Sequence, residues 1–326
     1  MDASVELISR ITTHPNADKL DLAQILGFQC VVQRNAYKAG DKIIYIRPDA
    51  ELPLEPWAEE YRNYSPKRIK AVKLRGEWSE GIVVPFSLLP IDLSYLEIGT
   101  EVSELIGVIH YEPPVPQELN AKRALPFGIP KTDEERFENI FDKLPFGEQV
   151  DVTLKIDGQS WSIYYNIRTK EFGILGRTLE YEHDKENRYS RHIIHKYPDL
   201  KERFISLCNR LNVSLCLRGE SYGNGIQNFK KNPHSVVSPD IAIFSCYMID
   251  ERRYANKGDS FYFLNICKEL SLPTVPILES GPLTQEMITK YSTGLDKIDG
   301  KPFEGVVIKH SNGSFKVINK TYDSYK

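Results

Sequence analysis

The sequence predicts an α+β protein, in which a small N-terminal β-barrel precedes a larger domain of mixed strands and helices. Residues 4–110 contain short segments of alternating apolar residues, separated by turns at spacings typical of a small barrel. Residues 111–130 are rich in proline, as expected of a semi-rigid linker. From Val150 onward, strand-like and helix-like segments mix without strict alternation, which favours α+β. We therefore expect domains at 1–110 and 131–326.

The N-terminal half contains one dense basic stretch, which includes Trp78. Its lysines and arginines fall on both odd and even positions, so they do not occupy one face of a strand. One explanation is an edge strand whose lysines prevent pairing with other chains. The other is a surface that follows nucleic-acid phosphates, as small barrels of the OB type use. We favour the second explanation, which predicts nucleic-acid contacts from Lys67, Arg68, Lys70, Lys73 and Arg75.

Composition narrows the class of protein. The 326 residues carry a formal net charge of −3, which excludes a uniformly basic nucleic-acid binder and requires any such surface to be local. The five cysteines are scattered and contain no C-x-x-C pair, so we expect free thiols and no zinc site. The sequence has no apolar run of membrane-spanning length and no signal-peptide pattern. We expect a monomeric intracellular protein, cytoplasmic or nuclear, that does not bind membranes.

Lys155 stands at the centre of the most informative stretch. Val152 and Leu154 alternate with polar residues and predict a strand, and Asp157-Gly158 predicts a hairpin turn. A lysine at the end of a strand is held by the sheet while its amine can extend into a cleft, which suits a nucleophile. The alternative is a hairpin whose lysine is simply solvated, and the short motif does not decide between the two.

Further candidate residues follow in order along the chain. Each also has an ordinary explanation, such as a surface ion pair, a core aromatic, a turn or a solvated lysine. Upstream of Lys155, a helix is expected to begin near Lys131, with Thr132 or Asp133 as its N-cap. The candidates are Arg136 on that helix, Arg177 and Glu220 at strand ends, Phe244 on a buried strand, Glu304 before Gly305, Lys309 and Lys316.

The order of these motifs resembles that of the covalent nucleotidyltransferases, which include ATP-dependent RNA and DNA ligases and mRNA capping enzymes. Thr132-Asp-Glu-Glu-Arg and Gly219-Glu, followed by Gly223-Asn-Gly-Ile-Gln, are similar to RNA ligases in particular. His14-Pro-Asn-Ala-Asp-Lys-Leu and Arg68-Ile-Lys-Ala-Val-Lys-Leu-Arg-Gly resemble the N-terminal OB domain of the Deinococcus-type RNA ligases. The resemblance covers nearly the whole chain. It implies an OB-type barrel followed by an adenylyltransferase domain.

The resemblance implies an ATP-dependent RNA ligase that seals 3′-hydroxyl and 5′-phosphate RNA ends, or nicked duplexes containing RNA, in RNA repair. Lys155 would attack the α-phosphorus of ATP and form lysyl-AMP. The implied ATP contacts are Arg136, Asp157, Gly158, Arg177, Glu220, Phe244 and Glu304. Mg²⁺ or Mn²⁺ would be held through water by Asp157, Glu220 and Glu304.

Two lysines would assist the nucleophile. A free lysine has a pKa of about 10.4, so nearby cations are needed to favour its neutral form at neutral pH. Lys309 and Lys316 would supply that charge and neutralise the phosphate in the transition state. Many ligases carry a second lysine two positions after the one at Lys316, where this chain has Ile318, so Lys309 or Lys320 is a candidate substitute.

Two other functions are compatible with the motifs. One is a DNA ligase or a GTP-using capping enzyme, although those enzymes usually carry the OB domain after the transferase domain. The other is a non-catalytic RNA-binding protein with a degenerate transferase fold. The presence of all the motif residues together argues against such a loss of function.

Overall fold

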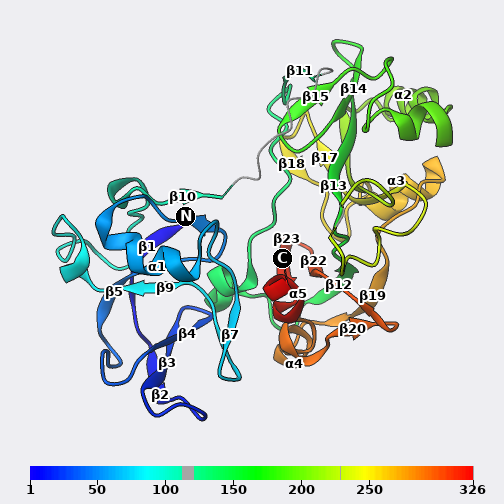
Figure 1. Ribbon diagram of the computed structural model, residues 1–326. Coiled ribbons are helices and arrows are strands. Elements are labelled where there is room, and N and C mark those ends of the chain that lie inside the picture. The colour runs from blue at the N-terminus through cyan, green and yellow to red at the C-terminus, as the bar shows by residue number, and fades with distance from the viewer. Residues whose placement is uncertain (112–120, 228, 326) are drawn as a thin grey trace. The chain divides into compact units, whose positions relative to one another are not determined.

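The computed structural model describes residues 1–111, 121–227 and 229–325. These residues form two compact units, whose elements are labelled in Figure 1. The first unit takes two short later segments of the chain besides the N-terminal region. Of the described residues, the first unit holds 1–111, 137–144 and 323–325, and the second holds 121–136, 145–227 and 229–322.

The first unit is built from short antiparallel strands, as the alternating sequence predicts. The sheets have the strand orders β1-β5-β9, β2-β3-β4, β7-β8 and β10-β6. The strands are β1 (Ala3–Leu7), β2 (Arg10–Thr13), β3 (Leu20–Ile25), β4 (Phe28–Gln33), β5 (Lys42–Ile46), β6 (Ala50–Glu51), β7 (Val72–Leu74), β8 (Glu77–Ser79), β9 (Ile82–Val84) and β10 (Ile109–His110). The helices are η1 (Pro56–Ala58), α1 (Glu59–Tyr64), η2 (Phe86–Leu88), η3 (Glu104–Ile106) and η4 (Phe137–Lys143).

Strand β5 organises the apolar interior of this unit. It pairs with β1 on one side and β9 on the other, so its backbone is hydrogen-bonded along both edges. Ile44 and Ile46 lie in one apolar cluster, whereas Ile43 and Tyr45 lie in a second cluster. Because successive side chains of a strand point to opposite faces, one strand contributes to both clusters.

The second unit contains two larger antiparallel sheets. The seven-stranded sheet has the order β11-β15-β14-β13-β16-β17-β18, and the four-stranded sheet has the order β19-β12-β22-β23. The strands of the first are β11 (Ala121–Ala124), β13 (Gln159–Asn166), β14 (Glu171–Leu175), β15 (Leu179–Tyr181), β16 (Leu215–Tyr222), β17 (Asp240–Met248) and β18 (Arg253–Tyr254). Those of the second are β12 (Gln149–Leu154), β19 (Ile277–Pro282), β22 (Gly305–His310) and β23 (Gly313–Ile318), and a separate hairpin joins β20 (Lys297–Ile298) to β21 (Lys301–Pro302).

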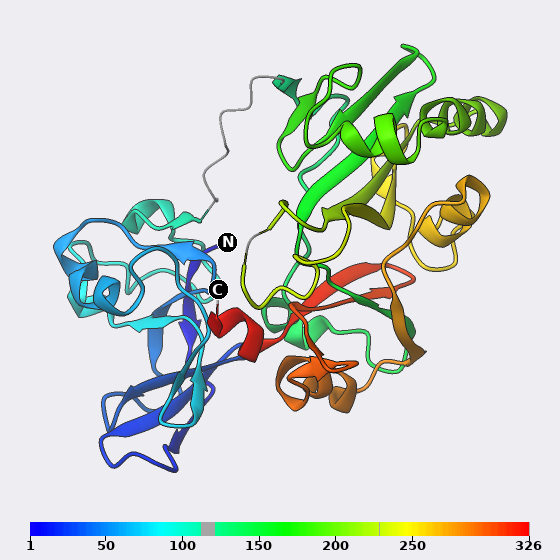
Figure 2. The same cartoon turned by 45° about the vertical axis from the view of Figure 1, so that its right-hand side comes forward.

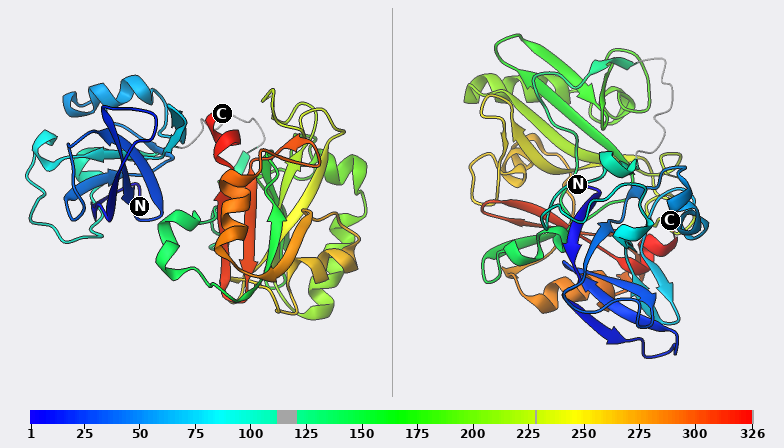
Figure 3. Two further views of the ribbon diagram at one scale, coloured as in Figure 1. Left: turned by 90° about the horizontal axis from the view of Figure 1, so that it is seen from below. Right: turned by 90° about the vertical axis from the view of Figure 1, so that its left-hand side faces the viewer.

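Helices cover the sheets of the second unit. The helices α2 and α3 lie beside the seven-stranded sheet (Figure 2). Phe204 of α2 and Phe263 of α3 share the largest apolar cluster with Trp161 and Leu217 of that sheet. The segment of α4 and η6 lies beside the four-stranded sheet (Figure 3). The helical segments are η5 (His192–Lys196), α2 (Leu200–Leu211), α3 (Phe263–Leu270), α4 (Gln285–Thr289), η6 (Lys290–Gly294) and α5 (Lys320–Tyr325), which the boundary between the units divides after Tyr322.

Two local predictions differ from the structure. Residues 131–136 are not helical, because the main chain there runs along β23, where the Lys316 amide donates to the Glu135 carbonyl at 2.7 Å. In the expected linker 111–130, residues 121–124 form strand β11, which pairs with β15. The linker prolines Pro113, Pro114 and Pro116 lie outside the described residues.

All five cysteines are free and buried. No helix in the described part of the chain has the length and apolar composition needed to cross a membrane.

Candidate active site

Lys155 follows directly on β12, which lies inside the four-stranded sheet between β19 and β22. Its amide donates to the Gly305 carbonyl at 3.0 Å, so the backbone of the lysine is held by the neighbouring strand. Its ammonium contacts Glu304 Oε2 at 2.6 Å, and the side chain is 30% exposed. The side chain is thus fixed at its base and accessible at its tip, as a nucleophile requires.

The sequence predicted a hairpin turn at Asp157-Gly158, but this pair does not close a hairpin. It connects β12 of the four-stranded sheet to β13 of the seven-stranded sheet. Gly158 fits there because a Cβ atom would lie 2.4 Å from the Ser221 carbonyl oxygen. The carbonyl of Asp157 accepts from Asn232 Nδ2 at 2.8 Å, and that of Gly158 accepts from Gln227 Nε2 at 3.0 Å. The nucleophile's turn is therefore held by the Gly-rich loop after β16.

Glu304 and Gly305 open β22 at the same edge of the sheet. A Cβ atom at Gly305 would lie 2.4 Å from the Val317 carbonyl oxygen, and its φ of +154° lies in a region that favours glycine. The Glu304 carbonyl accepts from the Asn319 amide at 3.0 Å. The close approach of β22 and β23 that glycine allows places Glu304 against the amine of Lys155.

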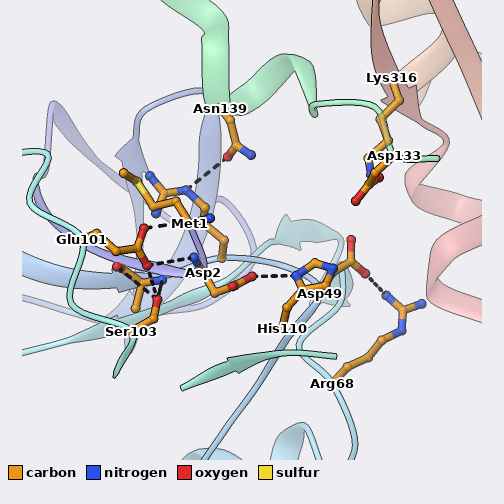
Figure 4. A network of polar contacts seen from close by, with 12 residues as sticks. Met1, Asp2, Asp49, Arg68, Glu101, Ser103, His110, Asp133, Asn139 and Lys316 are labelled. Carbon is orange, nitrogen blue, oxygen red and sulfur yellow. Dashed lines mark hydrogen bonds and ion pairs between the residues drawn. The ribbon is translucent and has the colours of Figure 1, made fainter. Parts of the chain in front are cut away.

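Lys316 lies on β23, opposite Val307 of β22. Its ammonium contacts Asp133 Oδ1 at 2.9 Å (Figure 4), and the second oxygen of Asp133 lies 3.8 Å from Arg177 Nη2. Burial opposes the charge on Asp133, but the cations of Lys316 and Arg177 outweigh it and lower the pKa of this carboxyl. Asp133, which the sequence suggested only as a helix cap, thus links the predicted catalytic Lys316 to the predicted ATP contact Arg177.

The remaining predicted ATP contacts come from three separate segments. Arg136 is buried, and its backbone bridges to that of Lys316. Glu220 on β16 lies opposite Ser160 of β13, whose hydroxyl is 2.8 Å from that of Thr132. Phe244 lies where β17 has one residue more than β16, and such a bulge can re-aim a side chain. Phe244 is half-buried and packs against the largest apolar cluster.

Lys309 lies apart from this group. It is opposite Asp151 on β12 and four residues along β22 from Gly305, a separation of roughly 13 Å at about 3.3 Å per residue. The side chain is buried, with its ammonium 5.5 Å from the ring centre of Phe263. Burial lowers the pKa of Lys309, against the opposing effect of nearby Glu134 and Asp151. Lys309 is thus separated from the Lys155 end of the β12–β22 pair, and its part in activating the nucleophile stays a prediction.

Carboxylates that could serve a metal ion gather beside Lys155. Tyr322 interacts electrostatically with both Asp157 and Glu304, so the two acids surround one side chain. Hard cations such as Mg²⁺ and Mn²⁺ prefer oxygen ligands of this type. Among the residues that the structure describes, no three His, Cys, Asp or Glu side chains are close enough to hold a metal ion by themselves. The two carboxylates offer oxygen donors of the kind that such a cation binds, and its binding through water by Asp157, Glu220 and Glu304 stays a prediction.

The basic stretch of the first unit divides into two parts. Arg68 is turned inward, where it contacts Asp49 (Figure 4) and Asp323, and only 17% of its side chain is exposed. Lys73 and Arg75 are exposed on the hairpin of β7 and β8, and the Lys73 ammonium lies 5.4 Å from the ring centre of Trp78. Arg68 is therefore an internal anchor, whereas the hairpin presents its charge to solvent.

His14 fixes the tip of this hairpin. Its Nδ1 accepts from the Asn16 amide at 3.1 Å, which leaves Nε2 to donate to the Leu74 carbonyl, also at 3.1 Å. The Asn16 side chain donates to the Arg75 carbonyl at 3.1 Å. The hairpin turn is therefore held by the loop that follows β2, which was singled out in the sequence only by its motif.

Sequence reasoning missed three residues of the site. Asn232 and Tyr322 lie 75 and 165 residues from Asp157 along the chain, and no local pattern links them to it. Asp133 belongs to a quoted motif, but its pairing with Lys316 depends on the path of residues 131–136 along β23. These contacts arise from the tertiary fold.

Comparison with known proteins agrees with this geometry. The RNA ligase family profile matches residues 148–322, more than half of the chain, and an OB-fold domain profile matches residues 2–86. A variant of Naegleria gruberi RNA ligase, solved with ATP and Mn, superposes with a TM-score of 0.82 at 24% identity, covering 100% of this chain and 99% of that one.

The same enzyme solved with pyrophosphate gives a TM-score of 0.80 at 26% identity, covering 98% of this chain and 97% of that one. No match is found among the curated proteins. The fold is thus an N-terminal OB-fold domain followed by a mixed α/β ligase domain, which confirms the predicted class. On the family match, supported by the arrangement around Lys155, the chain belongs to the RNA ligase family.

Proposed function

We propose that this protein is an ATP-dependent RNA ligase that joins 3′-hydroxyl and 5′-phosphate ends through a lysyl-AMP intermediate on Lys155. The observation that carries this proposal is the contact between the Lys155 ammonium and Glu304 at the edge where β12 and β22 meet. Several of the similar Naegleria ligase structures were solved with ATP and Mn or with AMP and Mn, and one with pyrophosphate, which supports ATP as substrate and a divalent cation as cofactor.

The first step transfers AMP from ATP to the protein. Before Lys155 attacks, its ammonium must lose a proton, and the Glu304 carboxylate at 2.6 Å is placed to accept it. The nitrogen then forms a bond to the α-phosphorus while the bond to pyrophosphate breaks. Mg²⁺ or Mn²⁺ near Asp157, Glu220 and Glu304 would supply positive charge to the leaving pyrophosphate.

The side chains of Lys316 and Arg177 are placed to bind an anion. Both contact the carboxylate of Asp133, whose charge they stabilise. A phosphate group could replace this carboxylate and accept the same donors. We therefore assign Lys316 to the α-phosphate and Arg177 to the nucleotide. Of the other predicted contacts, Arg136 lies beside Lys316, and Phe244 would stack on adenine.

The remaining steps use RNA. AMP passes from Lys155 to an RNA 5′-phosphate, and a 3′-hydroxyl then displaces AMP and seals the strand. The OB-fold domain would hold RNA through the exposed charges on the β7–β8 hairpin, with Lys67 and Lys70 as further contacts. The proposal also includes a domain division near residues 110 and 131, a Deinococcus-type assignment, a monomeric state and an intracellular location. The N-terminal motifs support the subfamily, and the free thiols suit a reducing compartment.

The order of the two domains weighs against the alternatives. The OB-fold profile matches residues 2–86 and precedes the ligase profile, whereas DNA ligases and capping enzymes usually have the reverse order. A direct test offers the protein RNA or DNA with 5′-phosphate and 3′-hydroxyl ends, together with ATP or GTP. We expect RNA joining with ATP, abolished by excess EDTA. Joining that requires GTP, occurs only with DNA, or persists in EDTA would contradict the proposal.

A further inference from the structure

Tyr322 is buried beside the nucleophile's turn and contacts a carboxylate of the site. Its hydroxyl donates to Asp157 Oδ2 at 2.8 Å, and only 2% of the residue is exposed. Its ring packs edge-on against Phe229 of the Gly-rich loop, with ring centres 5.4 Å apart. A hydroxyl that donates to a carboxylate in a buried setting forms a strong, orienting hydrogen bond.

Asn319 fixes the position of Tyr322. The Asn319 amide donates to the Glu304 carbonyl at 3.0 Å, and its side-chain Nδ2 donates to Leu295. Its Oδ1 accepts from the amides of Thr321 and Tyr322, at 3.1 and 3.3 Å. The fully buried Asn319 therefore sets where the chain turns at the start of α5, and it ties that turn to the strand that carries Glu304.

These contacts close a ring around Lys155. The Lys155 amide is bound to Gly305, whose neighbour Glu304 is bound to Asn319, and Asn319 positions Tyr322 against Asp157, two residues from the lysine. Residues 155–158, all described, lie outside any strand or helix. The orientation of the Asp157 side chain therefore depends on side-chain contacts and not on a sheet.

We propose that Tyr322 is a positioning residue for nucleotidyl transfer, which holds the Asp157 carboxylate in its working orientation beside Lys155. The inference rests on the proposed function for the role of Asp157. Without the hydroxyl, Asp157 would gain rotational freedom, and the loss would affect the chemical step more than ATP binding. The competing view is that Tyr322 only anchors the C-terminal segment.

The first test is Tyr322→Phe, which removes the hydroxyl and keeps the ring against Phe229. The matched control is Tyr247→Phe, a buried tyrosine of the same unit whose hydroxyl donates to the Gly128 carbonyl at 3.5 Å. Single-turnover formation of covalent AMP is measured over a range of ATP concentrations. We expect Tyr322→Phe to lower the maximal rate at least tenfold, with less than a threefold change in the ATP concentration at half-maximal rate. The control should stay within twofold in both, and a maximal rate for Tyr322→Phe within twofold of wild type overturns the proposal.

A second test needs neither ATP nor metal. The melting temperatures of Tyr322→Phe, Asp157→Ala and the double variant form a double-mutant cycle. We expect the double variant to lose clearly less than the sum of the two single losses, because both remove the same contact. Additive losses would show independent action and overturn the proposal. If wild type forms no covalent AMP while the cycle shows coupling, the proposed function fails and the Tyr322–Asp157 contact stands.

Discussion

The two ends of the β12–β22 pair place a lysine beside acids in different surroundings. At one end, Lys155 contacts Glu304 and remains 30% exposed. At the other end, Lys309 faces Asp151 but is buried over Phe263, and Asp151 is already bound by Lys257, Ser280 and Tyr262. Both ends pair a cation with carboxylates, yet Lys155 is partly exposed whereas Lys309 is buried. Accessibility, and not charge alone, distinguishes the candidate nucleophile Lys155 from Lys309.

The largest difference should appear when Lys316 and Lys309 are each replaced by methionine, which preserves length and removes charge. We expect Lys316→Met to slow covalent AMP formation about 100-fold or more, as removal of a group that stabilises transition-state charge does. Lys309→Met should stay within about threefold, because Lys309 lies some 13 Å along the strand from the nucleophile. Quenched-flow formation of lysyl-AMP measures both, and similar losses in the two variants would contradict the comparison.

The stability of the same variants is the control. The folded-state pKa of Lys309 is lowered, so the unfolded chain binds its proton more tightly than the folded protein does. Burial of Lys309 therefore costs stability at neutral pH, and this cost is relieved as pH rises from the folded pKa toward about 10.4. We expect Lys309→Met to melt at or above the wild-type temperature at pH 7. Between neutral and alkaline pH, the melting temperature of the variant should gain less than that of wild type. A marked loss at pH 7 would assign a stabilising charge to Lys309.

A smaller effect is expected in the first unit, where the basic stretch contains both kinds of residue. Replacing Lys73 or Arg75 by glutamine should reduce the salt dependence of RNA binding by about one unit of log–log slope each. Arg68→Gln should leave the slope unchanged but reduce the melting temperature, since Asp49 and the buried Asp323 lose a partner. RNA titrations at several salt concentrations, with thermal melts, measure both. Equal slopes for all variants would show that the hairpin is not part of the RNA-binding surface.

The sequence predicted well where the chemistry is local. Alternation located β12, and the Asp-Gly and Glu-Gly pairs contain two of the glycines at which a Cβ atom has no room. The sequence-based prediction was wrong where one sequence pattern is compatible with two different local structures. The Asp157-Gly158 turn joins two sheets instead of closing a hairpin, and the expected helix at Lys131 is an extended segment along β23. In both cases a long-range pairing replaced a locally favoured conformation.

The direction in which a side chain points was the other property that the sequence could not predict. The lysines and arginines from Lys67 to Arg75 look equivalent in sequence, and only the structure shows Arg68 turned toward two acids. Likewise Lys309 shares an apolar strand with Glu304-Gly305, but β22 is long enough to carry it away from Lys155. Residues such as Tyr322 could not be found at all, because their partners are distant in the chain.

The central claim is that Lys155 is the residue that carries AMP. The most direct measurement is to incubate the full-length protein with ATP and a divalent cation, digest it, and locate the added AMP by mass spectrometry. We predict one modified peptide, with AMP on Lys155, and none from the Lys155→Arg variant, because arginine does not lose its proton. AMP on Lys309 or Lys316 in wild type, or AMP retained by the Lys155→Arg variant, would contradict the account.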